Sequence, residues 1–535
     1  MGDNKQLYCG GEIYTVDDKR PTAEALAVKD GRIVAVGSRE ECRAVLGPGH
    51  EVINLEGCAL LPGFIDTHLH PTIMVYYDLN LNLSGVRSIG ELQAHIREEA
   101  GKGEKGSPWI VGLQLDDQAL SGSAPPTRRD LDAACSERPV VLITYDGHRV
   151  LANTRAIEAA GLTASTPDPA GGRIQREPDG YPAGVFHETA ASLILNQVPL
   201  PGMEELLAGA AATFTKIAAR GIVSVGAVLQ AGEEGPAGIN GAFDLPFLQM
   251  VLDRVPISLY SMVITGDMEI MAAARQSALH QPDSAAGHRV GAVKLFCDGT
   301  LQAGTAFMSR SYEDQPGNKG FLVSDKEALY ERMVAAHMAG LQLAVHAIGD
   351  AANRTCVELY ARLLREHPQE NHRHRLEHAS VLEPGLIRDI ARLGLVISSQ
   401  PLFIHYEKSW LARRLGPDRA GWTYPYRSLA EAGVKIAGAS DAPICPPDVL
   451  HALQCCVTRE GFETQQSLTT ARAVRLFTLD AAYAQFEEQV RGSLSPGKRA
   501  DMVVLSENPL SVPPDRIGSI RVLRTIHGGR VIFQA

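Results

Sequence analysis

The chain has 535 residues, of which 45% are hydrophobic, so it is long enough to bury a large core divided over two or three structural units. Its formal charge of −11 argues against a nucleic acid or an anionic membrane surface as a partner held by charge. Its nine cysteines show no C-x-x-C pair and no zinc-finger spacing, which indicates reduced thiols. We therefore expect a cytoplasmic protein without a secretory signal or a membrane-spanning segment.

The two ends of the chain both carry strand patterns. Short alternating apolar runs fill the first 60 residues and meet at an Asp-Gly turn at positions 30 and 31, a strong local signal of a β-hairpin. Three or four short strands make too small a core, and similar patterns return only near the other end. We predict a composite β-sandwich of residues 1–60 and 490–535, with a catalytic domain of residues 61–489 inserted between its halves.

Short β-branched runs then alternate with helical patterns, which is typical of parallel βα units. Eight strands are predicted, at 61–68, 221–225, 258–264, 290–296, 341–346, 374–378, 394–399 and 434–440. Eight is the number that closes a TIM-type (β/α)8 barrel, so the predicted fold class is α/β. About 150 residues separate the first two strands, and a loop of that length needs structure of its own. We predict an inserted subdomain at about 72–200.

The first predicted barrel strand ends in two histidines one residue apart. Side chains at i and i+2 of a strand point to the same side, so His68 and His70 can bind one ion. Neutral imidazole is a good ligand for zinc and similar divalent metals. A chance pair on a solvated loop is the alternative, but the preceding apolar run and Asp66 favour a metal site. A second pair, His372 and His374, lies among charged residues, where we expect solvent exposure instead of ligation.

Further candidate ligands fall at the ends of later strands. His346 ends the fifth strand, His378 ends the sixth, and Asp441 follows the eighth. Catalytic groups of a TIM barrel gather where its strands end, so these side chains are expected to converge with the first pair. His346 and His378 each have an ordinary alternative as satisfied core histidines, but their recurrence at successive strand ends favours ligation.

Lys294 and Asp441 add chemistry that histidines cannot supply. A lysine desolvated inside a barrel has a lowered pKa, and its neutral amine can take up CO2 to give a carbamate that bridges two metals. A structural ion pair between Lys294 and Asp298 is the alternative. A carboxylate at Asp441 can take a proton from a metal-activated water and deliver it to a leaving nitrogen. The metal lowers the pKa of that water towards about 7 and polarises the scissile carbonyl.

Several motifs resemble the amidohydrolase superfamily, and specifically its amidohydrolase 3 (YtcJ-like) branch, which includes N-substituted formamide deformylases. Examples are Leu-Pro-Gly-Phe-Ile-Asp-Thr-His-Leu-His at 61–70 and Val-Lys-Leu-Phe-Cys-Asp-Gly-Thr at 293–300. The other matching stretches are 345–353, 374–379, 439–443 and 492–505, with 146–153 and 180–188 in the insertion. The similarity covers nearly the whole chain.

The resemblance implies a barrel with a composite β-sandwich and one or two divalent metal ions, zinc first among them. By position, the implied ligands are His68, His70, Lys294 as an N6-carboxylated lysine, His346, His378 and Asp441. Asp441 is the implied general base, and His378 is the second catalytic candidate. We add Trp109, His148 and Asp298 as candidate substrate contacts, although such residues are more often local core.

The sequence therefore predicts a metal-dependent hydrolase that cleaves a non-peptide C–N bond of a small molecule, in an amide, a formamide or a cyclic amide. A deaminase or another C–N hydrolase acting on a heteroaromatic ring is the alternative within enzymes. A non-catalytic amidohydrolase-like scaffold is the alternative outside them, although such a protein has no physical need of an intact ligand set. The oligomeric state is left open, a homodimer included.

Overall fold

A computed structural model describes residues 4–103, 108–116, 120, 126–144, 149–169, 172–188, 190–199, 201–232 and 238–535. The chain divides into two compact units, one of Met1–Thr72 with Ala211–Ala535 and one of Ile73–Ala210. His148, a candidate substrate contact, lies outside the described residues. Within the described ranges, no helix has the length and apolar character needed to cross a membrane.

The first unit is built around a parallel sheet in which each strand pairs with the next along the chain. In the part of the chain that the structure describes, this sheet has eight strands: β6 (Phe64–Leu69), β13 (Ile222–Gln230), β14 (Ser258–Ile264), β15 (Arg289–Phe296), β16 (Gln342–Ala347), β17 (Arg375–His378), β18 (Val396–Ser399) and β19 (Lys435–Gly438). All eight predicted strands are found in this sheet, and with them the TIM-type α/β class. The first starts later than predicted, because residues 61 and 62 belong to the strand Ala59–Pro62 of another sheet.

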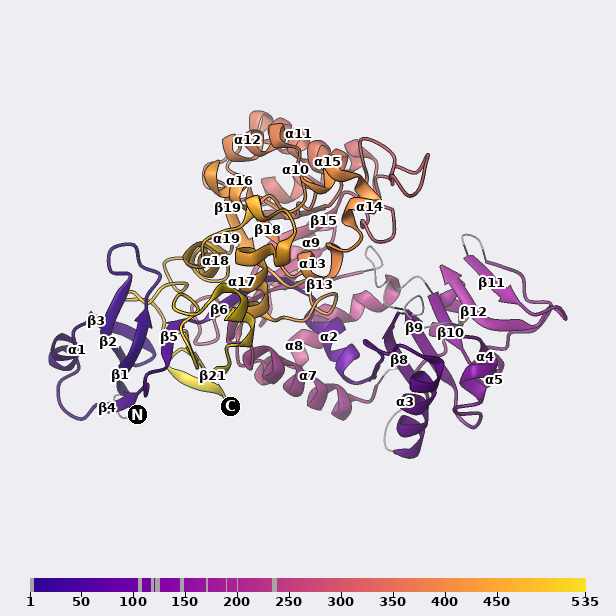
Figure 1. Ribbon diagram of the computed structural model, residues 1–535, viewed down its shortest axis with the longest axis horizontal. Coiled ribbons are helices and arrows are strands. Elements are labelled where there is room, and N and C mark those ends of the chain that lie inside the picture. The colour runs from indigo at the N-terminus through magenta and orange to yellow at the C-terminus, as the bar shows by residue number, and fades with distance from the viewer. Residues whose placement is uncertain are drawn as a thin grey trace. The chain divides into compact units, whose positions relative to one another are not determined.

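Helices follow the strands and lie outside the sheet, as Figure 1 shows for α10, α11, α12 and α16. Their bounds are α7 (Met203–Ala218), α8 (Asp244–Met250), α9 (Met268–Gln276), α10 (Lys326–Met338), α11 (Asp350–Glu366), α12 (Pro384–Arg392), α13 (Phe403–Glu407), α14 (Leu411–Leu415), α15 (Pro417–Ala420), α16 (Tyr426–Glu431), α17 (Val449–Thr458), α18 (Thr470–Leu476) and α19 (Leu479–Ala484). This order repeats the βα unit that is typical of a parallel sheet.

A hydrogen bond from one side chain joins the first and last strands of the barrel. The Thr67 hydroxyl of β6 donates to the Gly438 carbonyl of β19 at 3.0 Å and lies 3.0 Å from the Ser398 hydroxyl of β18. On the other side of β6, the backbone of Gly226 lies so close that a Cβ there would come within 1.9 Å of the Thr67 carbonyl oxygen. Only glycine permits this approach, which fixes the end of β6 between its two neighbours.

Strands from both ends of the chain join in a second sheet, seen in Figure 1 as indigo strands and a yellow β21. Its strands in the described residues are β1 (Lys5–Tyr14), β2 (Thr22–Lys29), β3 (Arg32–Gly37), β4 (Glu51–Asn54), β5 (Ala59–Pro62), β20 (Met502–Leu505), β21 (Val522–His527) and β22 (Arg530–Gln534). The predicted hairpin forms between β2 and β3, where Asp30 and Gly31 have φ of 50° and 78°. Because these strands are connected as one sheet, the two-layer sandwich stays a prediction.

Side chains alternate between two buried clusters on this terminal sheet. Leu7 and Ala27 pack with Leu46 of helix α1 (Arg39–Leu46) on one face. Tyr8 and Met502 belong to the cluster on the other face. Only the second cluster combines residues from both ends of the chain, so its burial depends on both ends.

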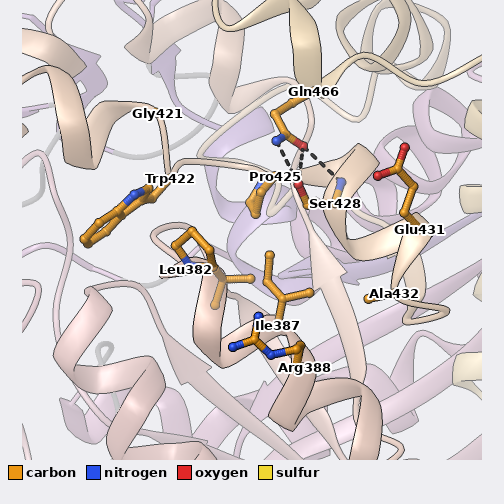
Figure 2. A pocket seen from close by; sticks show the side chains of 11 residues that line it. Leu382, Ile387, Arg388, Gly421, Trp422, Pro425, Ser428, Glu431, Ala432 and Gln466 are labelled. Carbon is orange, nitrogen blue, oxygen red and sulfur yellow. Dashed lines mark hydrogen bonds between the residues drawn. The ribbon is translucent and has the colours of Figure 1, made fainter.

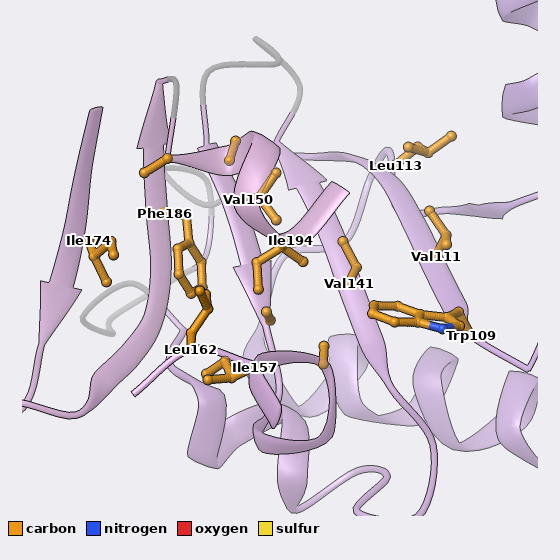
Figure 3. Close-up of a cluster of buried hydrophobic side chains, with 14 residues drawn as sticks. Trp109, Val111, Leu113, Val141, Val150, Ile157, Leu162, Ile174, Phe186 and Ile194 are labelled. Atoms are coloured by element: carbon orange, nitrogen blue, oxygen red, sulfur yellow. The ribbon is translucent and has the colours of Figure 1, made fainter. Parts of the chain in front are cut away.

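The second unit has its own mixed sheet of six strands among the described residues: β7 (Leu81–Asn82), β8 (Ile110–Leu115), β9 (Val140–Thr144), β10 (Arg149–Ala152), β11 (Gly172–Arg176) and β12 (Pro182–Glu188). The helices associated with it are α2 (Pro71–Asp78), α3 (Ile89–Gly101), α4 (Arg128–Asp132), α5 (Thr154–Ala159) and α6 (Ala191–Leu195). Figure 3 shows one face of this sheet, where Phe186, Ile157 and Trp109 lie in one apolar cluster. Trp109 is 9% exposed, so its environment is that of a core residue.

The Asn153 side chain connects separate segments of the second unit through four hydrogen bonds. Its side-chain oxygen accepts from the backbone N–H groups of Val140 and Ala156, each at 2.9 Å, and so caps helix α5. Its side-chain nitrogen donates to the carbonyls of Cys135 and Arg138, again at 2.9 Å. Asn153 is fully buried, so no water can replace these partners.

We predict that Asn153→Ala destabilises the second unit by about 2–4 kcal/mol, because it removes a helix cap and leaves buried backbone groups unpaired. Hydrogen exchange of the amides in β9 and α5 measures this loss. Asn196→Ala is the control, since Asn196 is exposed, and a change below about 0.5 kcal/mol is expected there. Equal protection of β9 in both variants would contradict the structural role of Asn153.

Candidate active site

The loop after β19 places a carboxylate against the end of β6. The Asp441 N–H donates to the His68 carbonyl, and the His70 N–H donates to the Ala442 carbonyl, both at 2.8 Å. One carboxylate oxygen of Asp441 therefore lies 3.4 Å from His68 Nε2 and 3.1 Å from His70 Nε2. The ligand atoms of these three residues lie within 4.8 Å of one another, close enough to share one ion.

Asp66 connects the end of β6 to the loop that follows β19. Its Oδ1 accepts hydrogen bonds from the N–H groups of His68 at 3.2 Å and Ser440 at 3.1 Å. Burial raises the pKa of Asp66 to about 7, although these hydrogen bonds act in the opposite direction. The residue before the histidine pair thus fixes the backbone that carries both histidines and Asp441.

The two later histidines reach the same place. The His378 ring lies 5.1 Å from the His68 ring and 4.5 Å from the His346 ring, measured between centroids. His378 has a φ of 69°, which breaks the alternation of β17. Both Glu377 and His378 can therefore contact His68, although they are neighbours in the chain. The structure thus brings His68, His70, His346, His378 and Asp441 together.

Lys294 is buried with no hydrogen-bond partner for its ammonium nitrogen. Its Nζ lies 4.9 Å from the centre of the Phe296 ring. Burial lowers the pKa of Lys294 to about 8, with the Glu377 and Asp441 charges opposing the shift. The alternative ion pair with Asp298 is absent from the contacts of the described residues.

Asp298 is engaged by backbone instead. Its two carboxylate oxygens accept from the N–H groups of Phe307, Ile348 and Gly349 at 2.8–3.0 Å. It also lies 3.6 Å from His346 Nε2. With 2% of its surface exposed, Asp298 is placed to position His346 and the two loops around it. This environment favours positioning over direct substrate contact.

Glu377 is a functional candidate that sequence reasoning missed. It accepts from His68 Nδ1 at 2.5 Å and from the Arg375 guanidinium at 2.6 and 2.9 Å, and all three side chains are fully buried. The His68 tautomer is thereby fixed with its proton on Nδ1, so that Nε2 keeps its lone pair for the site. Arg-x-Glu at strand spacing was the available signal, since i and i+2 share one side of a strand.

Neutral imidazoles are the stable form in this interior. Burial lowers the pKa of His68 to about 4 and that of His346 to about 3, with Lys294 adding to both shifts. Burial likewise holds the pKa of His378 well below its ordinary value. His378 Nδ1 lies 2.9 Å from the side-chain oxygen of Gln400, which leaves Nε2 free to accept. Such neutral rings are suited to metal ligation.

The second histidine pair corrects one expectation. His372 is 9% exposed and His374 is fully buried, so the prediction of solvent exposure is wrong. His374 Nε2 lies 2.8 Å from His337 Nδ1, and the ring of His372 donates from Nε2 to the Leu393 carbonyl at 3.0 Å. The charged neighbours do not make this segment exposed, because they form ion pairs within the fold. Arg373, for example, lies 2.8 Å from Glu488.

A pocket of about 280 Å³ lies elsewhere, between helices α12 and α16 and their loops. Figure 2 shows Leu382, Ile387 and Trp422 around it, with Gln466 hydrogen-bonded to Ser428. Its lining includes none of the predicted ligands, so this cavity is separate from the candidate site.

A TIM-type barrel with imidazoles and a carboxylate at its strand ends is suited to metal-dependent chemistry, and the comparisons identify the family. The sequence profile of the amidohydrolase family matches residues 51–533. The chain belongs to the amidohydrolase family.

Curated relatives match over nearly the full length. YtcJ of Bacillus subtilis (strain 168) is 31% identical over 99% of this chain and 99% of its own. The N-substituted formamide deformylase of Arthrobacter pascens is 26% identical over 99% of this chain and 98% of its own. A crystal structure of an uncharacterized metal-dependent hydrolase from Pyrococcus furiosus is 26% identical, with a TM-score of 0.74 over 95% of this chain and 100% of that chain. Together they support a hydrolase.

We predict that the buried histidines make stability depend on pH in the metal-free protein. A histidine with a pKa of 6.5 when unfolded and about 3 when folded binds a proton mainly in the unfolded state. Its contribution to stability is therefore full above pH 6.5 and is lost as pH falls below that value. Urea unfolding with chelator at pH about 7.5 and about 5.5 measures the change.

His346→Gln should reduce that loss of unfolding free energy by about 1 kcal/mol, because one such proton is removed. His95→Gln is the matched control, since His95 is an exposed histidine outside the candidate site. An identical pH dependence in His346→Gln and the unmodified chain would rule out the proposed protonation difference.

Proposed function

We propose that this chain is a metal-dependent hydrolase that cleaves a non-peptide C–N bond of a small molecule, in an amide, a formamide or a cyclic amide. The observation that carries the proposal is the convergence of His68 Nε2 and His70 Nε2 on one oxygen of Asp441. The full-length likeness to an N-substituted formamide deformylase supports the kind of bond. Nine free cysteines support a reducing, cytoplasmic location.

The residues fit one or two divalent metal ions, with zinc as the first candidate. Neutral imidazoles and a carboxylate are the donor set that zinc prefers. The proposed ligands are His68, His70, Lys294, His346, His378 and Asp441. A bound ion supplies a water of lowered pKa and polarises the carbonyl to be attacked.

Lys294 decides how many ions the site can hold. Its nitrogen is buried without a partner, which is costly for an ammonium group. The neutral amine can add to CO2 and release one proton, giving a carbamate whose two oxygens would serve as ligands among the histidines. We propose that Lys294 is N6-carboxylated when two ions are bound.

Asp441 is the proposed general base. Burial favours its protonated form, but the hydrogen bond from His70 and the neighbouring histidines outweigh this and hold its pKa below the ordinary range. The carboxylate is therefore ionised at neutral pH and can accept the proton of the attacking water. It then delivers this proton to the leaving nitrogen. His378, with Nε2 free to accept, is the second proposed catalytic residue.

Cleavage at a heteroaromatic ring is the second candidate, because aromatic side chains lie beside the ligands. The Phe403 ring is stacked on His378 at 6.3 Å, with an 8° angle between planes. The Phe296 ring lies 5.5 Å from His346. An apolar wall of this kind suits an aromatic substituent or ring.

We predict that Asp441→Asn lowers kcat by about 10²–10⁴-fold on the best substrate of a panel of N-formyl, N-acyl, cyclic and heteroaromatic amides. The amide cannot take up the proton, although it keeps the size of the side chain. Metal content is measured in parallel, and Asp253→Asn, at an exposed site, is the control. Full metal content with unchanged turnover in Asp441→Asn would refute the proton transfer.

We predict that Lys294→Ala loses one equivalent of metal, because the two proposed carbamate oxygens would be absent, while Lys294→Glu retains part of it through its own carboxylate. Elemental analysis of both variants after loading with zinc provides the measurement. Equal metal content in Lys294→Ala and the unmodified chain would exclude the carbamate.

A further inference from the structure

A second group of metal-ligating side chains lies apart from the six proposed ligands. His405 comes from α13, His451 comes from α17, and Glu460 lies in the short 3-10 helix Arg459–Gly461 that follows. The ligand atoms of these three residues lie within 4.8 Å of one another. Nothing in the proposed hydrolysis uses them.

One oxygen of Glu460 is the centre of this group. His405 Nδ1 lies 3.0 Å from Glu460 Oε1, and His451 Nε2 lies 2.9 Å from the same atom. The centres of the two imidazole rings are 4.8 Å apart, and the ring planes are inclined at 68°. Two nitrogen donors thus approach one carboxylate oxygen from different directions.

Cys455 lies beside this group and is a candidate fourth donor. Its Sγ lies 3.7 Å from Glu460 Oε1. Cys455 follows His451 by four residues on α17, so both side chains lie on one face of the helix. Cys456, the next residue, is equally buried but has no place on that face.

The other oxygen of Glu460 is shared by Lys408 and His405. Lys408 donates to Glu460 Oε2, and His405 Nδ1 lies 2.9 Å from the same oxygen as well as 3.0 Å from Oε1. Because Lys408 contacts Oε2, the carboxylate can bind an ion through Oε1 while keeping its lysine partner.

A left-handed turn of the backbone positions Glu460 next to the two histidines. Arg459 and Glu460 have φ of 49° and 47°, a left-handed conformation that costs about 1 kcal/mol or more per non-glycine residue. The fully buried Arg459 guanidinium holds this turn by donating to the Tyr424, Thr423 and Phe462 carbonyls. The strain is thus stabilised by surrounding hydrogen bonds.

We propose that His405, His451, Cys455 and Glu460 form a second site for a zinc-type divalent ion, distinct from the catalytic ligands. Ligands at about 2.0–2.3 Å from a tetrahedral ion are separated from one another by roughly 3.3–3.7 Å. The histidine separations of 2.9 and 3.0 Å from Glu460 Oε1 need only small outward movements to reach this geometry. Cys455 Sγ, 3.7 Å from the same oxygen but outside the 4.8 Å group, must move further to join them.

The site ties α13 to α17 and the turn after it. Helix α13 also carries Phe403, whose ring is stacked on His378 in the candidate active site. An ion held by His405 therefore fixes the helix that forms the apolar wall beside the catalytic residues. The side chains of His405, His451 and Glu460 are 41%, 29% and 15% exposed, so an ion can enter from solvent.

Cobalt loading of the full-length chain tests this proposal separately from the proposed function. None of the proposed catalytic ligands is a thiolate, so a sulfur-to-cobalt charge-transfer band can come only from another site. We expect this band in the unmodified protein and in Cys456→Ser, and its loss in Cys455→Ser.

Metal stoichiometry provides the second measurement. The double variant His405→Ala, His451→Ala should bind one equivalent of zinc less than the unmodified chain, while His95→Ala should bind the same amount. Circular dichroism shows whether each variant is folded, and Glu460→Gln provides a milder change for the same count.

Two results would overturn the proposal. Absence of the sulfur-to-cobalt band in the loaded protein would do so, and so would unchanged zinc content in both the double variant and Glu460→Gln. The group would then be an ion-pair network only. Loss of turnover in Asp441→Asn is independent of either result, so the two proposals fail separately.

Discussion

The whole site depends on how the first barrel strand is joined to the loop after the last one. Two backbone hydrogen bonds, from Asp441 to His68 and from His70 to Ala442, lock this loop onto the end of β6. Asp66 accepts from both segments and Thr67 connects β6 to β19. His68 and His70 therefore lie close to one oxygen of Asp441, although some 370 positions separate them from it in the chain. The remaining candidate ligands lie at the ends of neighbouring barrel strands, which meet at the same end of the barrel.

Burial determines the protonation states of the side chains in the candidate active site. The desolvated interior keeps His68 and His346 neutral and lowers the pKa of Lys294, so the donors suit a metal ion and repel each other little. The Arg375–Glu377 pair lies in the same interior and is stable because its charges are paired and hydrogen-bonded to each other and to His68. Burial thus keeps the His68 ring neutral, and the hydrogen bond to Glu377 places its one proton on Nδ1.

Phe403 connects the two parts of the first unit that carry chemistry. Its helix, α13, presents this ring to His378 and, two residues on, presents His405 to Glu460. A five-residue helix has little stability of its own, so contacts at both sides must hold it in place. This gives the second group of donors a physical role in shaping the apolar wall of the candidate active site.

The sequence alone determined the parallel barrel and its strand ends, because β-branched runs, their spacing and the His-x-His pattern are local signals. It also predicted that strands of both termini come together, whereas the structure shows that they join in one sheet. Only the tertiary structure decided that Glu377 orients His68, that Asp298 binds backbone instead of Lys294, and that His374 is buried. These facts depend on which side chains meet across strands far apart in the chain, and on a left-handed His378 that breaks the alternation on which the sequence reasoning relied.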